Sequence, residues 1–321
     1  MKQERKELLI FLAVTYGLTF LMGIPMAIFA QQGRELISFA YAQMLYPAAG
    51  LMLARLICRR DDPSLPKPFF LGFLALTALT IATCFLPMGF TYLAYLTYIS
   101  SITLGVILFA SKDDSLRPHN LSGENWGISL RIILLFVGIL LADIILRSAL
   151  STELSDTIQN LLTSNLLKLL LILPLLFLLT FPHYFGEEYG WRTYFQPLLQ
   201  NKFGLIKGVF LFGILWEFWH FPLVIFYYAP LSSSMSLLQL ILYRYVMVIL
   251  IAIFMAYAYM KTQNVWLPAF LHCVNNILAE LGPENGNCEL TWAMLGLFIL
   301  IRLVLFLPFL RSKVFRPQPH T

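Results

Sequence analysis

Four polar side chains of this 321-residue chain lie in or beside long apolar runs, where charged and hydrogen-bonding groups are costly. They are Glu187, His220, His272 and Asn276. A carboxylate and an imidazole can together remove a proton from a water molecule. A second imidazole and an amide can donate hydrogen bonds to the oxyanion that forms when that water attacks a carbonyl carbon. These residue types therefore predict hydrolysis of an amide bond without a covalent nucleophile.

A second glutamate lies beside Glu187, in the sequence GEEYGWR. Glu188 and Arg192 are four residues apart, so they can form an ion pair on one helix face. Glu187 lies about 100° away round the helix, so its carboxylate points elsewhere and could act as a general base. The alternative is a charged turn at the point where the chain leaves the membrane.

His220 lies in the sequence WEFWHFPL, whose other residues could hold its imidazole in place. Trp216 is four residues earlier and can pack on the ring. Glu217 is three residues earlier and can orient the ring or pair with Arg244. Pro222 follows closely, and we expect it to disturb the helix where the histidine lies.

His272 and Asn276 are four residues apart and share one helix face. Their alternative role is hydrogen bonding between helices, which contributes about 0.6–2 kcal/mol in membranes and is the role expected of Asn275. Glu187, His220 and His272 would also make a two-histidine, one-glutamate zinc site. Because His272 suits the oxyanion role and Asn276 is a poor zinc ligand, we expect no cofactor and keep zinc as the alternative.

Other ionisable residues within the apolar runs are expected to be structural. Asp143 and Arg147 are four residues apart and can pair along one helix. Arg244 and Arg302 are each expected to neutralise a neighbouring carboxylate.

The composition places the chain in a membrane. Hydrophobic residues make up 59% of the chain and charged residues only 12%, against about 25% in soluble domains. Apolar runs of roughly 18 residues or more recur, and each can cross a bilayer as a helix. We therefore predict an all-α, polytopic transmembrane bundle of about ten spans in a cell membrane. The expected spans are 7–30, 37–58, 68–88, 92–111, 130–148, 166–185, 206–228, 237–260, 265–281 and 290–310.

Lysine and arginine fall mainly on alternate connections, which predicts that both termini are cytoplasmic. This distribution explains the net charge of +5, and no motif suggests a nucleic-acid partner. The basic connections are residues 1–6, 58–67, 112–131, 202–207, 261 and 311–316.

The segment 186–204 is too polar to be a span. Gly186 and Pro197 bracket it, which predicts a separate short helix over 187–199 near the cytoplasmic side.

Cys84 and Cys288 are both expected near the outer face. A disulfide between them is one interpretation, and unpaired apolar cysteines are the favoured one.

Taken in order, the polar residues resemble the motifs of the CPBP (CAAX-protease and bacteriocin-processing) family of intramembrane endopeptidases. The strings GEEYGWRTYFQPLLQ, WEFWHFP and VWLPAFLHCVNN, within about 181–277, carry the resemblance. Trp216 stands where the family often has Phe, and Thr193 stands where a Gly commonly follows the Arg; neither removes a catalytic group.

The resemblance implies an intramembrane protease, described for the family as either glutamate-dependent or metal-dependent. It implies that Glu187 activates water with help from His220, that His272 and Asn276 form the oxyanion site, and that Glu188, Arg192 and Trp216 support them. The implied substrate is a peptide or membrane protein, cleaved in some members near its C-terminus. Its identity, and whether it is prenylated, stay open.

The predicted organisation has three parts: transmembrane helices of unknown role over 1–165, a CPBP-like catalytic core over 166–311, and a disordered cytoplasmic tail over 312–321. Two other functions are considered. One is a non-catalytic immunity or scaffold protein of the same fold. The other is a transporter, which the lack of an internal repeat disfavours.

Overall fold

The computed structural model describes residues 2–151, 155, 158–159, 166–232, 235–279 and 290–316. Every element in these residues is a helix, which confirms the all-α fold class. The chain divides into two compact units. The first unit comprises 1–124, 176–195 and 264–269, and the second comprises 125–175, 196–263 and 270–321.

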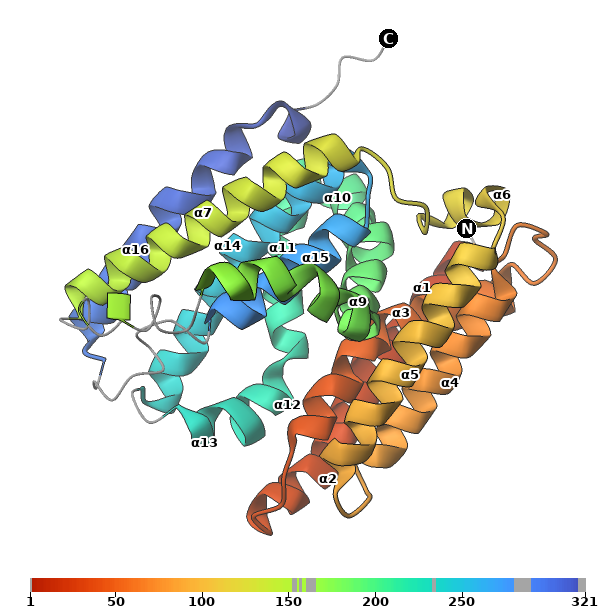
Figure 1. Cartoon of the computed structure of the whole chain (residues 1–321), viewed down its shortest axis with the longest axis horizontal. Coiled ribbons are helices and arrows are strands. Elements are labelled where there is room, and N and C mark those ends of the chain that lie inside the picture. The colour runs from red at the N-terminus through yellow and green to blue at the C-terminus, as the bar shows by residue number, and fades with distance from the viewer. Residues whose placement is uncertain are drawn as a thin grey trace. The chain divides into compact units, whose positions relative to one another are not determined.

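The first unit is built on a row of long helices that lie side by side (Figure 1). Helices α1 and α4 pack on α3, and α5 packs on α4. The elements are α1 (Lys2–Leu12), η1 (Ala13–Gly17), α2 (Leu18–Gln31), α3 (Ile37–Cys58), α4 (Lys67–Thr83), α5 (Gly89–Ala110), α6 (Asp113–Leu116) and η2 (Arg117–His119). The end of α9 (Leu166–Gly190), the π-helical turn η3 (Trp191–Phe195) and the start of α15 (Trp266–Ala279) complete it.

The second unit is centred on α14, which packs against α11 and α16, while α7 packs on α16 and α10 on α11. It also contains the first part of α9 and most of α15. Its other elements are α7 (Trp126–Leu150), α10 (Gln196–Phe203), α11 (Leu205–Trp219), α12 (Phe221–Leu223), η4 (Val224–Tyr228), α13 (Ala229–Leu231), α14 (Leu237–Thr262), α16 (Trp292–Phe306), η6 (Leu307–Arg311) and η7 (Lys313–Phe315).

The helices confirm a polytopic membrane protein, with fewer full spans than predicted. Within the part of the chain that the structure describes, seven helices are long and apolar enough to cross a bilayer, and an eighth is counted if the bent pair Leu205–Trp219 and Phe221–Leu231 is one span. The difference from about ten has a simple cause. Lys67–Thr83 has 17 residues and α15 has 14 described residues, and about 20 are needed to cross the hydrocarbon core.

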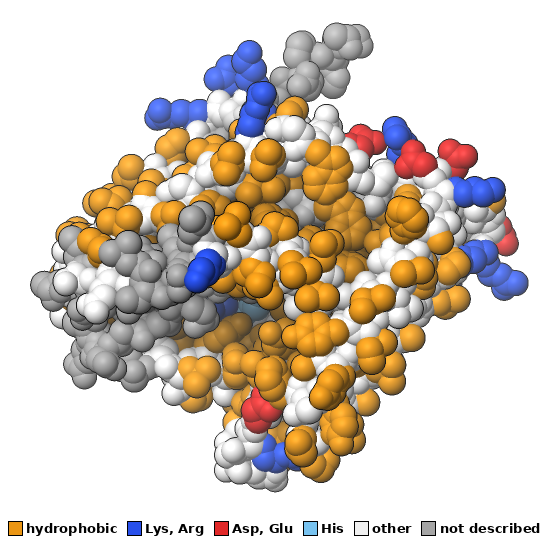
Figure 2. Space-filling model, in the orientation of Figure 1, with side chains coloured by type: hydrophobic (Ala, Val, Ile, Leu, Met, Phe, Trp, Pro, Cys, Tyr) orange, Lys and Arg blue, Asp and Glu red, His pale blue; other side chains and the backbone are white. Residues whose placement is uncertain are grey.

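The outward face of α5 has the character of a lipid-facing surface. Tyr95, Ile99, Ile102, Val106 and Phe109 recur at helical spacing, and each is more than 60% exposed. Figure 2 shows such hydrophobic side chains over most of this face, with the charged side chains of the first unit gathered mainly at the end that carries α6 and the N-terminus.

The prediction of a separate short helix over 187–199 was wrong. Helices α9 and α10 and the turn η3 run on as one apolar helix, Lys168–Phe203. Gly186 and Gly190 do not break it. A Cβ atom on Gly186 would lie 2.8 Å from the Met44 carbonyl oxygen, and one on Gly190 would collide with the backbone of Pro47. The two glycines therefore form a G-x-x-x-G surface that lets α9 approach α3 closely.

Two further predictions, the Cys84–Cys288 disulfide and the disordered tail over 312–321, involve residues that are only partly described. Cys288 lies outside the described residues, so its pairing with Cys84 is not tested. In the expected tail, Lys313–Phe315 form a 3₁₀ helix and Phe315 is buried. The last five residues of the expected tail, 317–321, lie outside the described residues.

Candidate active site

The first motif lies on α9 within the first unit. Arg192 Nε donates to Glu188 Oε2 at 2.6 Å, and both side chains are fully buried. The ion pair that the spacing predicts is therefore present. Glu187 is also buried, with 1% of its surface exposed. The π-helical turn η3 follows the two glutamates and contains Arg192, and such turns are frequent at functional sites.

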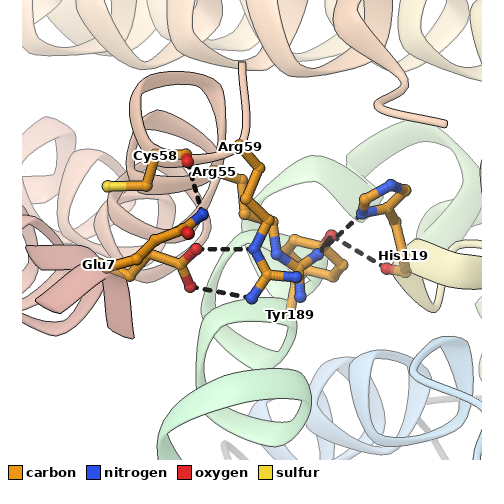
Figure 3. A network of polar contacts seen from close by, with 7 residues as sticks. Glu7, Arg55, Cys58, Arg59, His119 and Tyr189 are labelled. Carbon is orange, nitrogen blue, oxygen red and sulfur yellow. Dashed lines mark hydrogen bonds and ion pairs between the residues drawn. The ribbon is translucent and has the colours of Figure 1, made fainter. Parts of the chain in front are cut away.

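Tyr189 joins this motif to a polar network at the end of α3 (Figure 3). Its hydroxyl accepts a hydrogen bond from Arg55 Nη1 at 2.8 Å and donates one to the carbonyl oxygen of His119 at 3.0 Å. Arg55 Nη1 also lies 3.4 Å from His119 Nδ1. Beside them, Arg59 donates to both carboxylate oxygens of Glu7, at 2.6 and 3.0 Å. The network thus ties α9 and α1 to the end of α3.

His119 in this network is held neutral. Burial, and then the charge of Arg55, lower the pKa of His119 to about 4. Because Nδ1 faces the Arg55 donor, the ring hydrogen belongs on Nε2, which donates to Ser64 Oγ at 3.1 Å. Ser64 donates to Asp62 Oδ1 at 2.6 Å, and this hydrogen bond lowers the pKa of Asp62. Two neutral side chains therefore connect the guanidinium of Arg55 to the carboxylate of Asp62.

The second motif lies in the second unit, at the break between α11 and α12. The helix axis bends by 47° there, as expected from Pro222. Glu217 is buried, and its Oε1 accepts from Arg244 Nε at 2.7 Å. Its Oε2 lies 3.4 Å from Nδ1 of His220, and the Trp216 carbonyl oxygen lies 3.1 Å from the same nitrogen. Glu217 thus fills both roles that the sequence left open.

These contacts fix the tautomer of His220. Both neighbours of Nδ1 are acceptors, so a neutral ring carries its hydrogen on Nδ1 and its lone pair on Nε2. An imidazole oriented through Nδ1 in this way can accept a proton, or bind a metal ion, through Nε2.

Aromatic rings bring the two histidines of the second unit together. The Trp216 ring lies 6.2 Å from the His220 ring and 6.2 Å from the His272 ring, measured between centroids. Trp219 packs edge-on against His220 at 4.8 Å, closer than the predicted partner Trp216. Trp216 is therefore a shared neighbour of two imidazoles from different parts of the chain.

Asn276 lies one turn beyond His272 on α15 and is exposed. Its Oδ1 accepts a hydrogen bond from Asn275 Nδ2 at 3.3 Å. This contact directs the carbonyl end of the Asn276 amide toward Asn275 and leaves its NH₂ group as the end that can donate to an oxyanion.

Asp143 forms a separate buried cluster in the second unit. Its Oδ2 accepts from Arg147 Nε at 3.1 Å and from Arg302 Nε at 2.9 Å. Tyr243, Met247 and Phe298 surround the two guanidiniums. The predicted pairing of Asp143 with Arg147, and the neutralising role of Arg302, are confirmed.

The predicted site residues therefore fall into two groups. Trp216, His220 and His272 are neighbours in the second unit, whereas Glu187 belongs to the first unit. The approach of Glu187 to the histidines stays a prediction.

The network of Arg55, His119 and Tyr189 was not predicted from the sequence. Arg55 lies inside the expected span 37–58, and a charged side chain within a span needs a polar partner. Its position in the sequence therefore could have predicted a polar network there.

The described residues contain no group of three His, Cys, Asp or Glu side chains placed to hold a metal ion. The orientation of His220 suits a ligand, but it supplies one donor of the three that a zinc site of this class needs.

The helices and the buried polar motifs define a multi-pass α-helical membrane protein. Residues 168–278 match the family described as type II CAAX prenyl endopeptidase Rce1-like. This segment contains all the motif residues, and the match confirms the resemblance to the CPBP family.

A stretch of 51 residues is 51% identical to CAAX prenyl protease 2 of Methanococcus maripaludis. It covers 16% of this chain and 18% of that protein. No solved structure matches the chain significantly.

Proposed function

We propose that this chain is an intramembrane endopeptidase that hydrolyses a peptide bond with water activated by Glu187 and His220. One observation carries the proposal: the segment that matches the Rce1-like family contains Glu187, His220, His272 and Asn276, the four residues whose side chains could together hydrolyse an amide bond. The orientation of His220 by Glu217 supports it, because a general base needs a fixed tautomer.

In the proposed reaction, the water oxygen attacks the carbonyl carbon while its proton passes to Glu187, assisted by His220 Nε2. His272 and the Asn276 NH₂ group donate hydrogen bonds to the oxyanion. When the C–N bond breaks, the same proton passes to the leaving nitrogen. The Glu188–Arg192 ion pair holds the helix turn that carries Glu187.

The name of the Methanococcus relative suggests the substrate class to try first. We propose a membrane protein or peptide that ends in a prenylated CAAX sequence. The test uses a synthetic farnesylated CAAX peptide in detergent, together with a comparison of protein termini in membranes from cells with the wild-type chain or the Glu187→Gln variant.

Glu187→Gln should lower kcat by about a thousandfold or more, because it removes the base without changing side-chain size. Glu35→Gln, at an exposed position, is the matched control and should retain activity. Full activity of Glu187→Gln would exclude the proposed mechanism. Loss of activity with a zinc chelator, restored by zinc, would instead favour the metal-dependent alternative.

A further inference from the structure

Three aromatic rings connect the helix of the first motif to the start of the helix that carries His272. Phe185 of α9 stacks on Tyr189 one turn later, with ring centroids 4.9 Å apart and planes at 24°. On its other side, Phe185 stacks on Trp266, the first residue of α15, at 4.8 Å and 23°. Phe181 packs edge-on against the same indole at 5.6 Å. All these residues belong to the first unit.

Tyr189 and Trp266 both donate hydrogen bonds to one short segment, residues 119–124, which begins at the last residue of η2. The Tyr189 hydroxyl donates to the His119 carbonyl oxygen at 3.0 Å, and Trp266 Nε1 donates to the Leu121 carbonyl oxygen at 2.8 Å. Asn264 Nδ2 donates to the Glu124 carbonyl oxygen at 2.8 Å. The segment 119–124 and the ring stack therefore form a closed loop of contacts, which we call the brace.

The remaining contacts fix the two ends of the brace. Arg55 donates to the Tyr189 hydroxyl, so that hydroxyl must direct its own hydrogen toward His119. Asn264 Oδ1 accepts from the backbone N–H of Trp266 at 3.0 Å and so caps the first turn of α15. Neither aromatic side chain can turn without breaking a hydrogen bond.

The brace holds residues that lie beside the proposed catalytic groups in the chain. Glu187 lies between Phe185 and Tyr189 on α9, so the angle at which those two rings are held sets the direction of Glu187. The helix α15 begins at Trp266 and carries His272 and Asn276 further along the chain.

We propose that Tyr189 and Trp266 are positioning residues. Their hydrogen bonds to segment 119–124 fix the rotation and the axial position of α9 relative to the first turn of α15. They thereby fix the direction in which the Glu187 carboxylate points during hydrolysis. This inference rests on the proposed function, because it assumes that Glu187 and the α15 residues act on one bond. The two side chains need not touch the substrate.

The test removes only the polar atoms of the brace. Tyr189→Phe and Trp266→Phe keep an aromatic ring and lose the hydroxyl or the indole N–H. Tyr98→Phe and Trp292→Phe are the matched controls, because both side chains are about half exposed and lie outside the brace. The readouts are kcat and KM on the farnesylated CAAX peptide, the thermal midpoint, and hydrogen exchange of the backbone amides of residues 117–126.

Each brace variant should lower kcat about tenfold, because Glu187 is no longer aligned with the scissile bond. KM should change less than twofold, because the residues that bind the peptide are unchanged. Exchange in residues 117–126 should accelerate about fivefold, which corresponds to the roughly 1 kcal/mol of one hydrogen bond. The double variant should lose less kcat than the product of the two single losses, because both changes open one closed loop. The control variants should match the wild type.

Faster exchange with an unchanged kcat would overturn the inference, since the brace would then be structural only. Unchanged exchange would overturn it as well. An active Glu187→Gln variant would overturn the proposed function instead. Loss of activity in Glu187→Gln with fully active brace variants would leave the proposed function standing and remove the inference alone.

Discussion

Asp143 and Glu217 are both buried carboxylates of the second unit that accept hydrogen bonds from an arginine of another helix. Their other partners differ. Asp143 has a second arginine, Arg147, and the side chains of Arg147 and Asp143 are fully buried. Glu217 has instead the imidazole of His220, whose side chain is 13% exposed. The same type of contact, a buried carboxylate with an arginine, can therefore join helices at Asp143 and orient an imidazole at Glu217.

The comparison predicts opposite consequences of removing the two negative charges. At Asp143 the cost should appear in stability, because two buried guanidiniums lose their shared counter-charge. At Glu217 the cost should appear in catalysis, because the ring of His220 loses the charged one of the two acceptors that face its Nδ1.

The largest effect is expected for Asp143→Asn. Breaking a buried ion pair by removing one partner costs about 3–5 kcal/mol of unfolding free energy, and here two cations lose their shared partner. Chemical denaturation in detergent measures this loss, and kcat per folded molecule should stay near the wild-type value. A loss below about 1 kcal/mol would contradict the assignment of this cluster as a helix joint.

Glu217→Gln should come next, with kcat lower by about tenfold to a hundredfold, as for other carboxylates that orient a histidine. Glu217→Gln should also lower the unfolding free energy, because Arg244 loses its carboxylate partner. A second substitution separates this loss of stability from the loss of catalysis. The double variant Glu217→Gln/Arg244→Gln should regain stability and stay slow. Recovery of kcat in the double variant would show that the charge of Arg244, and not the tautomer of His220, caused the loss.

The sequence predicted contacts between residues close in the chain better than contacts between distant ones. The Glu188–Arg192 and Asp143–Arg147 pairs follow from a spacing of four on a helix, and both are present. The brace was not predicted, because Tyr189 and His119 are 70 residues apart and Trp266 and Leu121 are 145 apart. No local pattern encodes such a pairing.

The prediction of a break at Gly186 was wrong for a related reason. In a single sequence, Gly186 can indicate either a break or a close approach of another helix. Only the position of α3 decides between them, and that position depends on contacts far along the chain.

The polar network around His119 provides a third case to compare with Asp143 and Glu217. There the arginine, Arg55, faces a neutral imidazole and not a carboxylate. The pKa of His119 is about 4 in the folded chain, against an ordinary value of 6.5. The unfolded chain therefore binds more protons between these values, and the stabilisation present above pH 6.5 is lost as the pH falls toward 4.

The unfolding free energy should fall by an amount on the order of 1–3 kcal/mol over this interval. His119→Gln should remove that part of the slope, which is measured as the difference between the two stability-versus-pH curves. Asp62 and Arg59 also act on the ring, so the comparison is made at constant ionic strength. Two identical curves would contradict the low pKa of His119.

The smallest effect is expected for Arg302→Met, in the same cluster as Asp143. Asp143 and Arg147 remain as a neutral pair, and the variant removes the one cation that the pair does not balance. Replacing a buried charge by an apolar side chain of similar volume is often neutral, so the unfolding free energy should change by less than about 1 kcal/mol. The introduced thioether would lie beside Met247, whose sulfur contacts Arg302 in the wild type. If Arg302→Met destabilised the chain as much as Asp143→Asn, the geometry of the cluster rather than its charge balance would determine its stability, and Asp143 would need both arginines.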